Sequence, residues 1–161
     1  MTSRLHRFFL IACLAQLVLL TACDSTAVMD EHIALPDNRW PANHVVKMEA
    51  GIEDTSATYN IYINLRNAGS YSFSNLFLFM NTYTPDGALA RDTIELVLAD
   101  DQGQWKGDGM GDIWDNRILF KKDQRFPMPG TYRFELEQAM RIDPLPGVMD
   151  AGIRIEKNVA R

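Results

Sequence analysis

The chain has 161 residues and a formal net charge of −5, and it carries no run of basic residues, which excludes electrostatic binding to nucleic acid. Its length suits one domain, and 47% hydrophobic residues can form a core. Its two cysteines, Cys13 and Cys23, both lie near the N-terminus, so the rest of the chain has no thiol for a disulfide, a nucleophile or a metal centre.

The N-terminal segment has the three parts of a secretory signal peptide. Arg4 and Arg7 make its start positive, and the 13 residues from Phe8 to Leu20 are apolar. This apolar run is shorter than the ~20 residues that a membrane-spanning helix needs. It ends in Leu20-Thr21-Ala22-Cys23, which resembles a bacterial lipobox. That resemblance implies cleavage before Cys23 and a covalent lipid on Cys23, with no other cofactor expected.

We therefore expect three regions. Residues 1–22 form the lipoprotein signal peptide, residues 23–43 the lipidated cysteine with a polar tether and lead-in, and residues 44–161 the folded domain. Trp40, between Arg39 and Pro41, is expected to close the edge of the core. Cleavage leaves 14 basic and 21 acidic residues, a net charge of −7. Anionic headgroups would repel such a domain, so the acyl chains must supply the membrane attachment.

From His44 onward, apolar and polar residues alternate with the period of a β-strand. Leu76–Met80 is continuously apolar and predicts a central strand covered on both faces. Turn residues separate the segments, and no segment has a sustained helical period. The sequence predicts an all-β fold, a single antiparallel β-sandwich, Ig-like or jelly-roll-like, of about seven or eight strands. The expected strands are 46–52, 59–66, 76–80, 89–98, 117–121, 131–140 and 151–156.

The stretch 99–116 is rich in Gly and Asp and is the best candidate for a cation site. Clustered carboxylates on a loop can supply the oxygen ligands that Ca²⁺ prefers. The spacing does not fit an EF-hand, however, and no tandem repeat follows, so a solvated hairpin loop is favoured and no metal is predicted. The candidate ligands are Asp100, Asp101, Asp108 and Asp112.

No catalytic motif is present. The histidines His32 and His44 share no pattern with a serine nucleophile, and neither GxSxG nor HExxH occurs. The sequence therefore predicts a protein that is not an enzyme and has no small-molecule substrate.

Four residues are candidates for a partner surface. Tyr62 and Arg66 lie on the polar side of an alternating strand, where an exposed aromatic can mark an interface. Trp105 and Trp114 belong to a larger set of aromatics that can bind sugars or proteins, although aromatics at strand spacing more often pack in a core.

Several strings resemble the gliding-motility lipoprotein GldH family of the Bacteroidota. They include Tyr59 to Asn67, Tyr71 to Leu78, Leu98-Ala99-Asp100, Phe126-Pro127 and Arg154 to Lys157, in the same order along nearly the whole mature chain. The resemblance implies a non-enzymatic envelope lipoprotein of the gliding and type IX secretion-associated machinery. Its implied partners are the membrane, through acyl chains, and other envelope, gliding or secretion proteins. The string after Cys23 lacks the Lys-acidic-acidic signal of surface export, which favours a periplasm-facing position on either membrane.

Two other functions remain open from the sequence. One is a lipid-anchored glycan-binding β-sandwich that uses Trp105 or Trp114. The other is a calcium-dependent binding module that uses the aspartates of residues 99–116.

Overall fold

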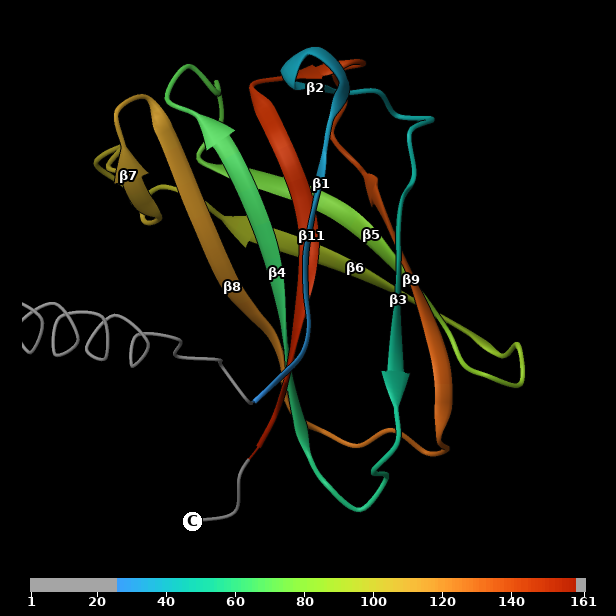
Figure 1. Ribbon diagram of the computed structural model, residues 1–161. Helices are drawn as coiled ribbons and strands as arrows, with labels where there is room; N and C mark the ends of the chain where they lie inside the picture. Colours follow the sequence, from blue (N-terminus) through green and yellow to red (C-terminus); the bar gives the residue numbers. More distant parts are fainter. Residues whose placement is uncertain (1–25, 159–161) are drawn as a thin grey trace, which may run out of the picture.

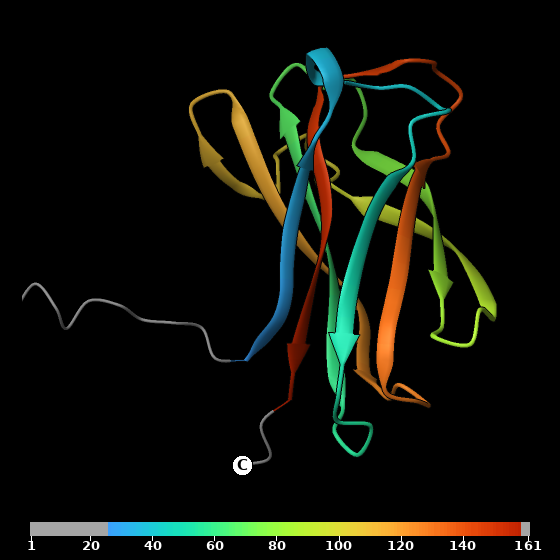
Figure 2. The ribbon, with the colours of Figure 1, turned by 45° about the vertical axis from the view of Figure 1, so that its right-hand side comes forward.

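The computed structural model describes residues 26–158, and the lipobox with Cys23 lies outside this range. Two antiparallel sheets face each other (Figures 1 and 2). The five-stranded sheet has the order β1 (Ala27–Ala34), β11 (Val148–Lys157), β4 (Tyr59–Ala68), β8 (Ile113–Gln124) and β7 (Asp108–Met110). The four-stranded sheet has the order β3 (Val46–Ile52), β9 (Gly130–Gln138), β5 (Asn75–Tyr83) and β6 (Leu89–Val97). The predicted all-β antiparallel sandwich is confirmed.

The core lies between the two sheets because each strand sends alternate side chains inward. On the five-stranded sheet, Ile63, Leu65 and Ile153 are fully buried, and they face Leu78 and Phe134 of the other sheet. Burying an aliphatic or aromatic side chain of this size stabilises a fold by about 1.5–3 kcal/mol. The apolar residues that alternate in the sequence are thus the side chains that each strand directs into the core.

One end of the sandwich is closed by short elements. The 3-10 turn η2 (Pro36–Asn38) leads into β2 (Arg39–Trp40), which pairs with β10 (Leu145–Pro146). Trp40 is completely buried, and its Nε1 donates a hydrogen bond to the His44 carbonyl at 2.8 Å. The expectation that Trp40 closes the core is confirmed.

The lead-in assigned to residues 23–43 needs a correction, because Ala27–Ala34 is a full strand of the five-stranded sheet. This strand, β1, pairs with β11 along its whole length. It was missed because it is an edge strand with a bulge between Ala27 and Met29, so its alternation is broken. The sandwich therefore begins close to Cys23 and not at residue 44.

Two further expectations are corrected. Residues 108–116 are not all loop, because β7 and the start of β8 form a hairpin there. Glycine and aspartate, which strands disfavour, hid this pairing in the sequence. The central strand β5 is covered on one face only, since Phe77 on its outer face is 38% exposed.

Candidate interaction surface

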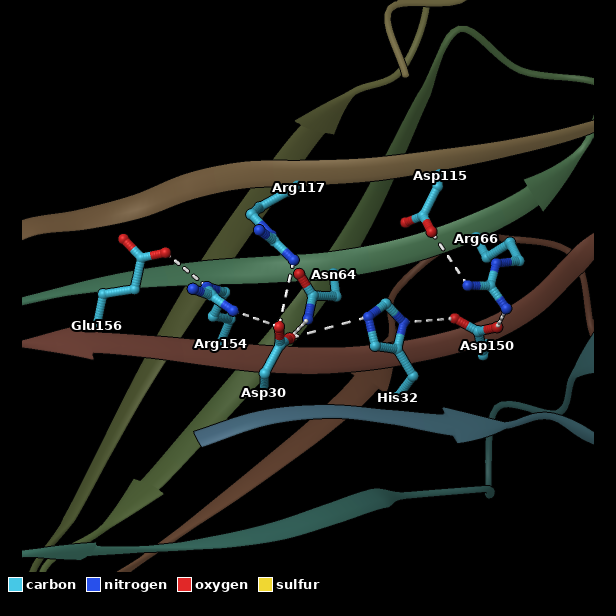
Figure 3. A network of polar contacts seen from close by, with 9 residues as sticks. All are labelled: Asp30, His32, Asn64, Arg66, Asp115, Arg117, Asp150, Arg154 and Glu156. Carbon is cyan, nitrogen blue, oxygen red and sulfur yellow. Dashed lines mark hydrogen bonds and ion pairs between the residues drawn. The ribbon is translucent and has the colours of Figure 1, made fainter. Parts of the chain in front are cut away.

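The outer face of the five-stranded sheet carries a connected set of charged side chains, which we call the ion network (Figure 3). These residues come from β1, β11, β4 and β8, and each occupies an outward position of its strand. The members are Asp30, His32, Asn64, Arg66, Asp115, Arg117, Asp150, Arg154 and Glu156.

Asp30 is the centre of one half of the network. It accepts hydrogen bonds from Arg154, from Asn64 at 2.8 Å and from Arg117 at 3.3 Å. Arg154 also donates to Glu156. Burial would raise the pKa of Asp30, but the bonds from Arg154 and Asn64 outweigh burial and hold this pKa below its ordinary value of 3.8. The carboxylate is therefore kept ionised and fixed in place.

Asp150 is the centre of the other half. Its carboxylate lies 3.0 Å from His32 Nδ1 and 2.9 Å from an Arg66 nitrogen. Arg66 also donates to Asp115 at 3.0 Å, and this bond is the largest effect raising the pKa of Arg66. His32 joins the two halves, because its Nε2 lies 3.9 Å from Asp30. Four adjacent strands, β1, β11, β4 and β8, are thus tied together by charge-assisted contacts.

Of the four residues predicted for a partner surface, Tyr62 and Arg66 share this outer face. Tyr62 is half-buried, and burial together with the Glu156 carboxylate raises its pKa. Arg66 is already paired with two carboxylates, so it helps to hold the sheet as well as to face solvent.

The two tryptophans lie elsewhere, in an aromatic group near the end of β4. Trp105 stacks against Trp114 at a centroid distance of 6.4 Å and against Tyr71 at the same distance. Both tryptophans are half-buried. They do not join Tyr62 and Arg66 in one surface, and their rings contact each other instead of forming an open platform.

The four aspartates named as weak cation ligands are spread over one turn, which holds Asp100 and Asp101, a strand and a second turn. Asp100 caps its own turn, accepting hydrogen bonds from the backbone of Gln102 at 2.9 Å and of Gln104 at 2.8 Å. Asp108 belongs to β7, and Asp112 lies in the turn between β7 and β8. Within residues 26–158, no group of three or more His, Cys, Asp or Glu side chains could hold a metal ion.

A hollow of about 440 Å³ lies beside the Arg66 end of the ion network. Arg66 and Asp115 form its polar side, and Met110, Ile113 and Met149 form its apolar side. Met110 is 84% exposed and Ile113 37% exposed. Methionine and arginine are both enriched at protein–protein interfaces relative to the rest of a protein surface.

The sequence could not reveal most of this surface. The sequence does not single out Asp30, Asp150 and Arg154 as part of a surface, and it shows His32 only as a histidine without a catalytic pattern. Asp150 and Arg154 alternate with apolar residues on β11, whereas Asp30 and His32 lie on either side of Glu31. Pairing across strands is invisible in one sequence.

Comparison with known proteins places the chain in a family. Residues 27–155 match the family model described as GldH lipoprotein. The chain belongs to the GldH lipoprotein family. Among relatives, the gliding motility lipoprotein GldH homolog of Christiangramia forsetii is 33% identical over 149 residues, covering 88% of this chain and 91% of that protein. The gliding motility lipoprotein GldH of Flavobacterium johnsoniae is 33% identical over 147 residues, covering 87% and 91%.

Membership of the GldH family makes this chain a membrane-anchored envelope lipoprotein associated with gliding motility. No helix among residues 26–158 is long and apolar enough to cross a membrane. Among solved structures, the infectious bursal disease virus VP2 subviral particle matches at 11% identity with a TM-score of 0.34. That match covers 84% of this chain and 34% of the viral chain, and so low a score supports no inference.

Proposed function

We propose that this protein is a non-enzymatic structural or assembly component of the gliding-motility and type IX secretion-associated machinery. It is held by acyl chains on Cys23, faces the periplasm and acts by binding another envelope protein. The observation that supports this most is the hollow beside the ion network, where exposed Met110 and Ile113 adjoin the fixed pair Arg66–Asp115. The relatives named as gliding motility lipoproteins supply the biological setting.

The surroundings of the hollow favour binding by a rigid surface. Arg66 is held by carboxylates from two neighbouring strands, so it loses little conformational freedom when a partner docks. Met110 stands at the end of the β7–β8 hairpin and can adjust to an apolar side chain. A partner would therefore meet one adaptable apolar contact beside charges that are already oriented.

Complementation of a deletion strain tests the proposal. We expect Cys23→Ser to fail because the domain is released from the membrane, and Met110→Asp to fail although the protein is anchored at normal abundance. Leu89→Asp is the matched control, because Leu89 is 56% exposed on the opposite sheet. It is expected to restore gliding and secretion.

Co-purification from crosslinked envelopes, with the native anchor retained, supplies the second readout. Met110→Asp is expected to lose a partner that wild type and Leu89→Asp both recover. Full restoration of gliding by Cys23→Ser, or unchanged crosslinks with Met110→Asp, would contradict the proposal.

A further inference from the structure

One end of the sandwich lies immediately beside the anchor residue. Thr26 is the third residue after Cys23, and its carbonyl accepts a hydrogen bond from the backbone of Lys157 at 2.8 Å. The backbone of Asn158 donates to the Thr58 carbonyl, also at 2.8 Å. The start of β1, the end of β11 and the start of β4 therefore meet here (Figure 1). We call this the anchor end.

The turn between β3 and β4 and the last residues of β8 complete the anchor end. Asp54 pairs with Lys157 at 2.7 Å, and Asp123 accepts a hydrogen bond from Asn158 at 2.7 Å. Acidic and basic side chains are mixed in this turn, around the end of β8 and at the end of β11. They are Glu53, Asp54, Lys122, Asp123, Arg125 and Lys157.

The chain between Cys23 and Thr26 is too short to lift the domain away from the bilayer. An extended chain covers at most about 3.3–3.6 Å per residue, so Thr26 lies within about 11 Å of the acylated residue. Acyl chains in the bilayer hold that residue at the headgroup level. The anchor end is consequently forced close to the headgroups.

The opposite end, which we call the distal end, is dominated by aspartates. β4 runs from the anchor end to Ala68, and its 10 residues span roughly 33 Å. The loops around Ala68 and the 3-10 turn lie beyond it (Figure 1). Among the described residues there, acidic side chains outnumber basic ones. The acids are Asp37, Asp100, Asp101, Asp108, Asp112 and Asp143, and the bases are Arg39, Lys106 and Arg141.

Because salt screens charges, the orientation of the domain decides whether its aspartates are repelled by anionic headgroups. Charges interact appreciably only within a Debye length of about 8 Å at physiological salt. A domain that stands upright holds the distal aspartates several Debye lengths from anionic headgroups. A domain that lies on either sheet brings them within range and also dehydrates ion pairs, such as Arg66–Asp150 on the five-stranded sheet and Arg91–Glu137 on the four-stranded sheet. The upright position therefore avoids both costs.

We propose that the domain stands end-on on the bilayer, with the anchor end against the headgroups and the aspartate-rich distal end, with the Met110 hollow, directed away from the membrane. This inference rests on the acylation of Cys23, which belongs to the proposed function. The surface that contacts lipid is the part of the anchor end around Thr26, Glu53 and Lys122.

Single-cysteine labelling tests the orientation. The chain has only Cys13, in the signal segment, and Cys23, which the lipid blocks, so an introduced cysteine is the one reactive thiol of the mature protein. Glu53→Cys reports on the anchor end, Gln102→Cys on the distal end, and Ala34→Cys on the distal part of the five-stranded sheet. All three residues are exposed. Each acylated variant is first checked for an unchanged Tm and is then labelled with a fluorophore at its introduced cysteine. The labelled protein is bound to vesicles of phosphatidylethanolamine, phosphatidylglycerol and a lipid with a nitroxide on its headgroup.

We expect the nitroxide lipid to quench the label at position 53 at least threefold more than the labels at positions 34 and 102. Equal quenching at position 34 means that the domain lies on its five-stranded sheet, and it would overturn the inference. Bound protein without quenching at position 53 would also overturn it while leaving the proposed function intact. If the acylated protein does not bind the vesicles at all, the anchor itself fails, and both proposals fall.

A linker variant is the matched control. Ten Gly/Ser residues inserted between Ser25 and Thr26 add a reach of about 16–19 Å. The label at position 53 is then expected to lose most of its quenching while the vesicles still retain the protein. Undiminished quenching would show that the short connection does not set the position of the domain.

Discussion

Arg66 on β4 reaches Asp150 on β11 at 2.9 Å, so a guanidinium that is 37% exposed neutralises a carboxylate side chain that is only 9% exposed. Removing Arg66 therefore leaves the nearly buried charge of Asp150 with fewer contacts. The pair joins two neighbouring strands of the sheet that also holds the anchor-proximal strand β1.

We expect Arg66→Ala to lower the free energy of unfolding by about 1–2 kcal/mol. This is less than the roughly 3–5 kcal/mol for breaking a fully buried pair, because water reaches Arg66 and His32 still contacts Asp150. Urea denaturation measures the loss. Lys47→Ala is the control, since Lys47 is 63% exposed and 3.7 Å from Glu135, and it should change stability by less than about 0.5 kcal/mol. Equal losses for both variants would contradict a structural role for Arg66.

Gly152 is required where β1 pairs with β11. A Cβ atom at this position would lie 1.8 Å from the Glu31 carbonyl oxygen of β1, which no packing permits. We expect Gly152→Ala to lower the free energy of unfolding by about 1–3 kcal/mol. The variant should also expose β1 to protease, because this strand must move away from β11. Gly51→Ala is the matched control, since nothing lies within 4 Å of its Cβ position. Thermal denaturation and limited proteolysis compare the two, and equal stability would refute the close approach.

Asp30 should shape the response of stability to acid. Its pKa in the folded protein is below 3.8. Its ionisation therefore contributes stability that is present above the unfolded-state pKa and is lost as the pH falls through the folded-state pKa. We expect Asp30→Asn to be less stable at pH 7 and to lose less stability than wild type between about pH 5 and pH 2.

Urea midpoints measured across that pH range check this prediction. Asp101→Asn is the control, because Asp101 is exposed and no ion pair of residues 26–158 includes it. If the stability of wild type and of Asp30→Asn falls equally as the pH is lowered, the bonds from Arg154, Arg117 and Asn64 do not stabilise the ionised Asp30.

Trp105 is expected to act in packing. Its contacts with Tyr71 and Trp114 suggest that Trp105→Ala lowers the free energy of unfolding by about 1–3 kcal/mol, less than a fully buried tryptophan because it is half-buried. Migration in polysaccharide affinity gels should be the same for wild type and variant. Retardation of wild type that Trp105→Ala abolishes would favour the glycan-binding alternative.

Calcium should leave the melting temperature unchanged. The Asp100 carboxylate is already engaged by the backbone of its own turn. Thermal denaturation with excess Ca²⁺ and with EDTA gives the comparison, since a ligand that binds only the folded state raises the Tm. A rise with Ca²⁺ that EDTA reverses would favour the calcium-dependent alternative.

The sequence by itself determined the class of fold and predicted a lipid anchor at Cys23, because both depend on local signals. Residues such as Ile61, Ile63 and Leu65 alternate along one strand, and the lipobox is a contiguous string ending at Cys23. The inward face of most strands followed directly from this alternation, and the place of Trp40 between Arg39 and Pro41 predicted that it closes the edge of the core.

Only the tertiary structure decided which charges meet. Arg154 binds Asp30 across 124 positions of the chain, and Asn116 joins Asn67 across 49. Such pairs depend on strand order and register, which are set by non-local packing and leave no local trace. The same reason hid β1, whose strand character comes from pairing with β11 and not from its own pattern. The sequence therefore predicted a lipid anchor at Cys23, and the tertiary structure showed that the first strand of the folded domain begins at Ala27.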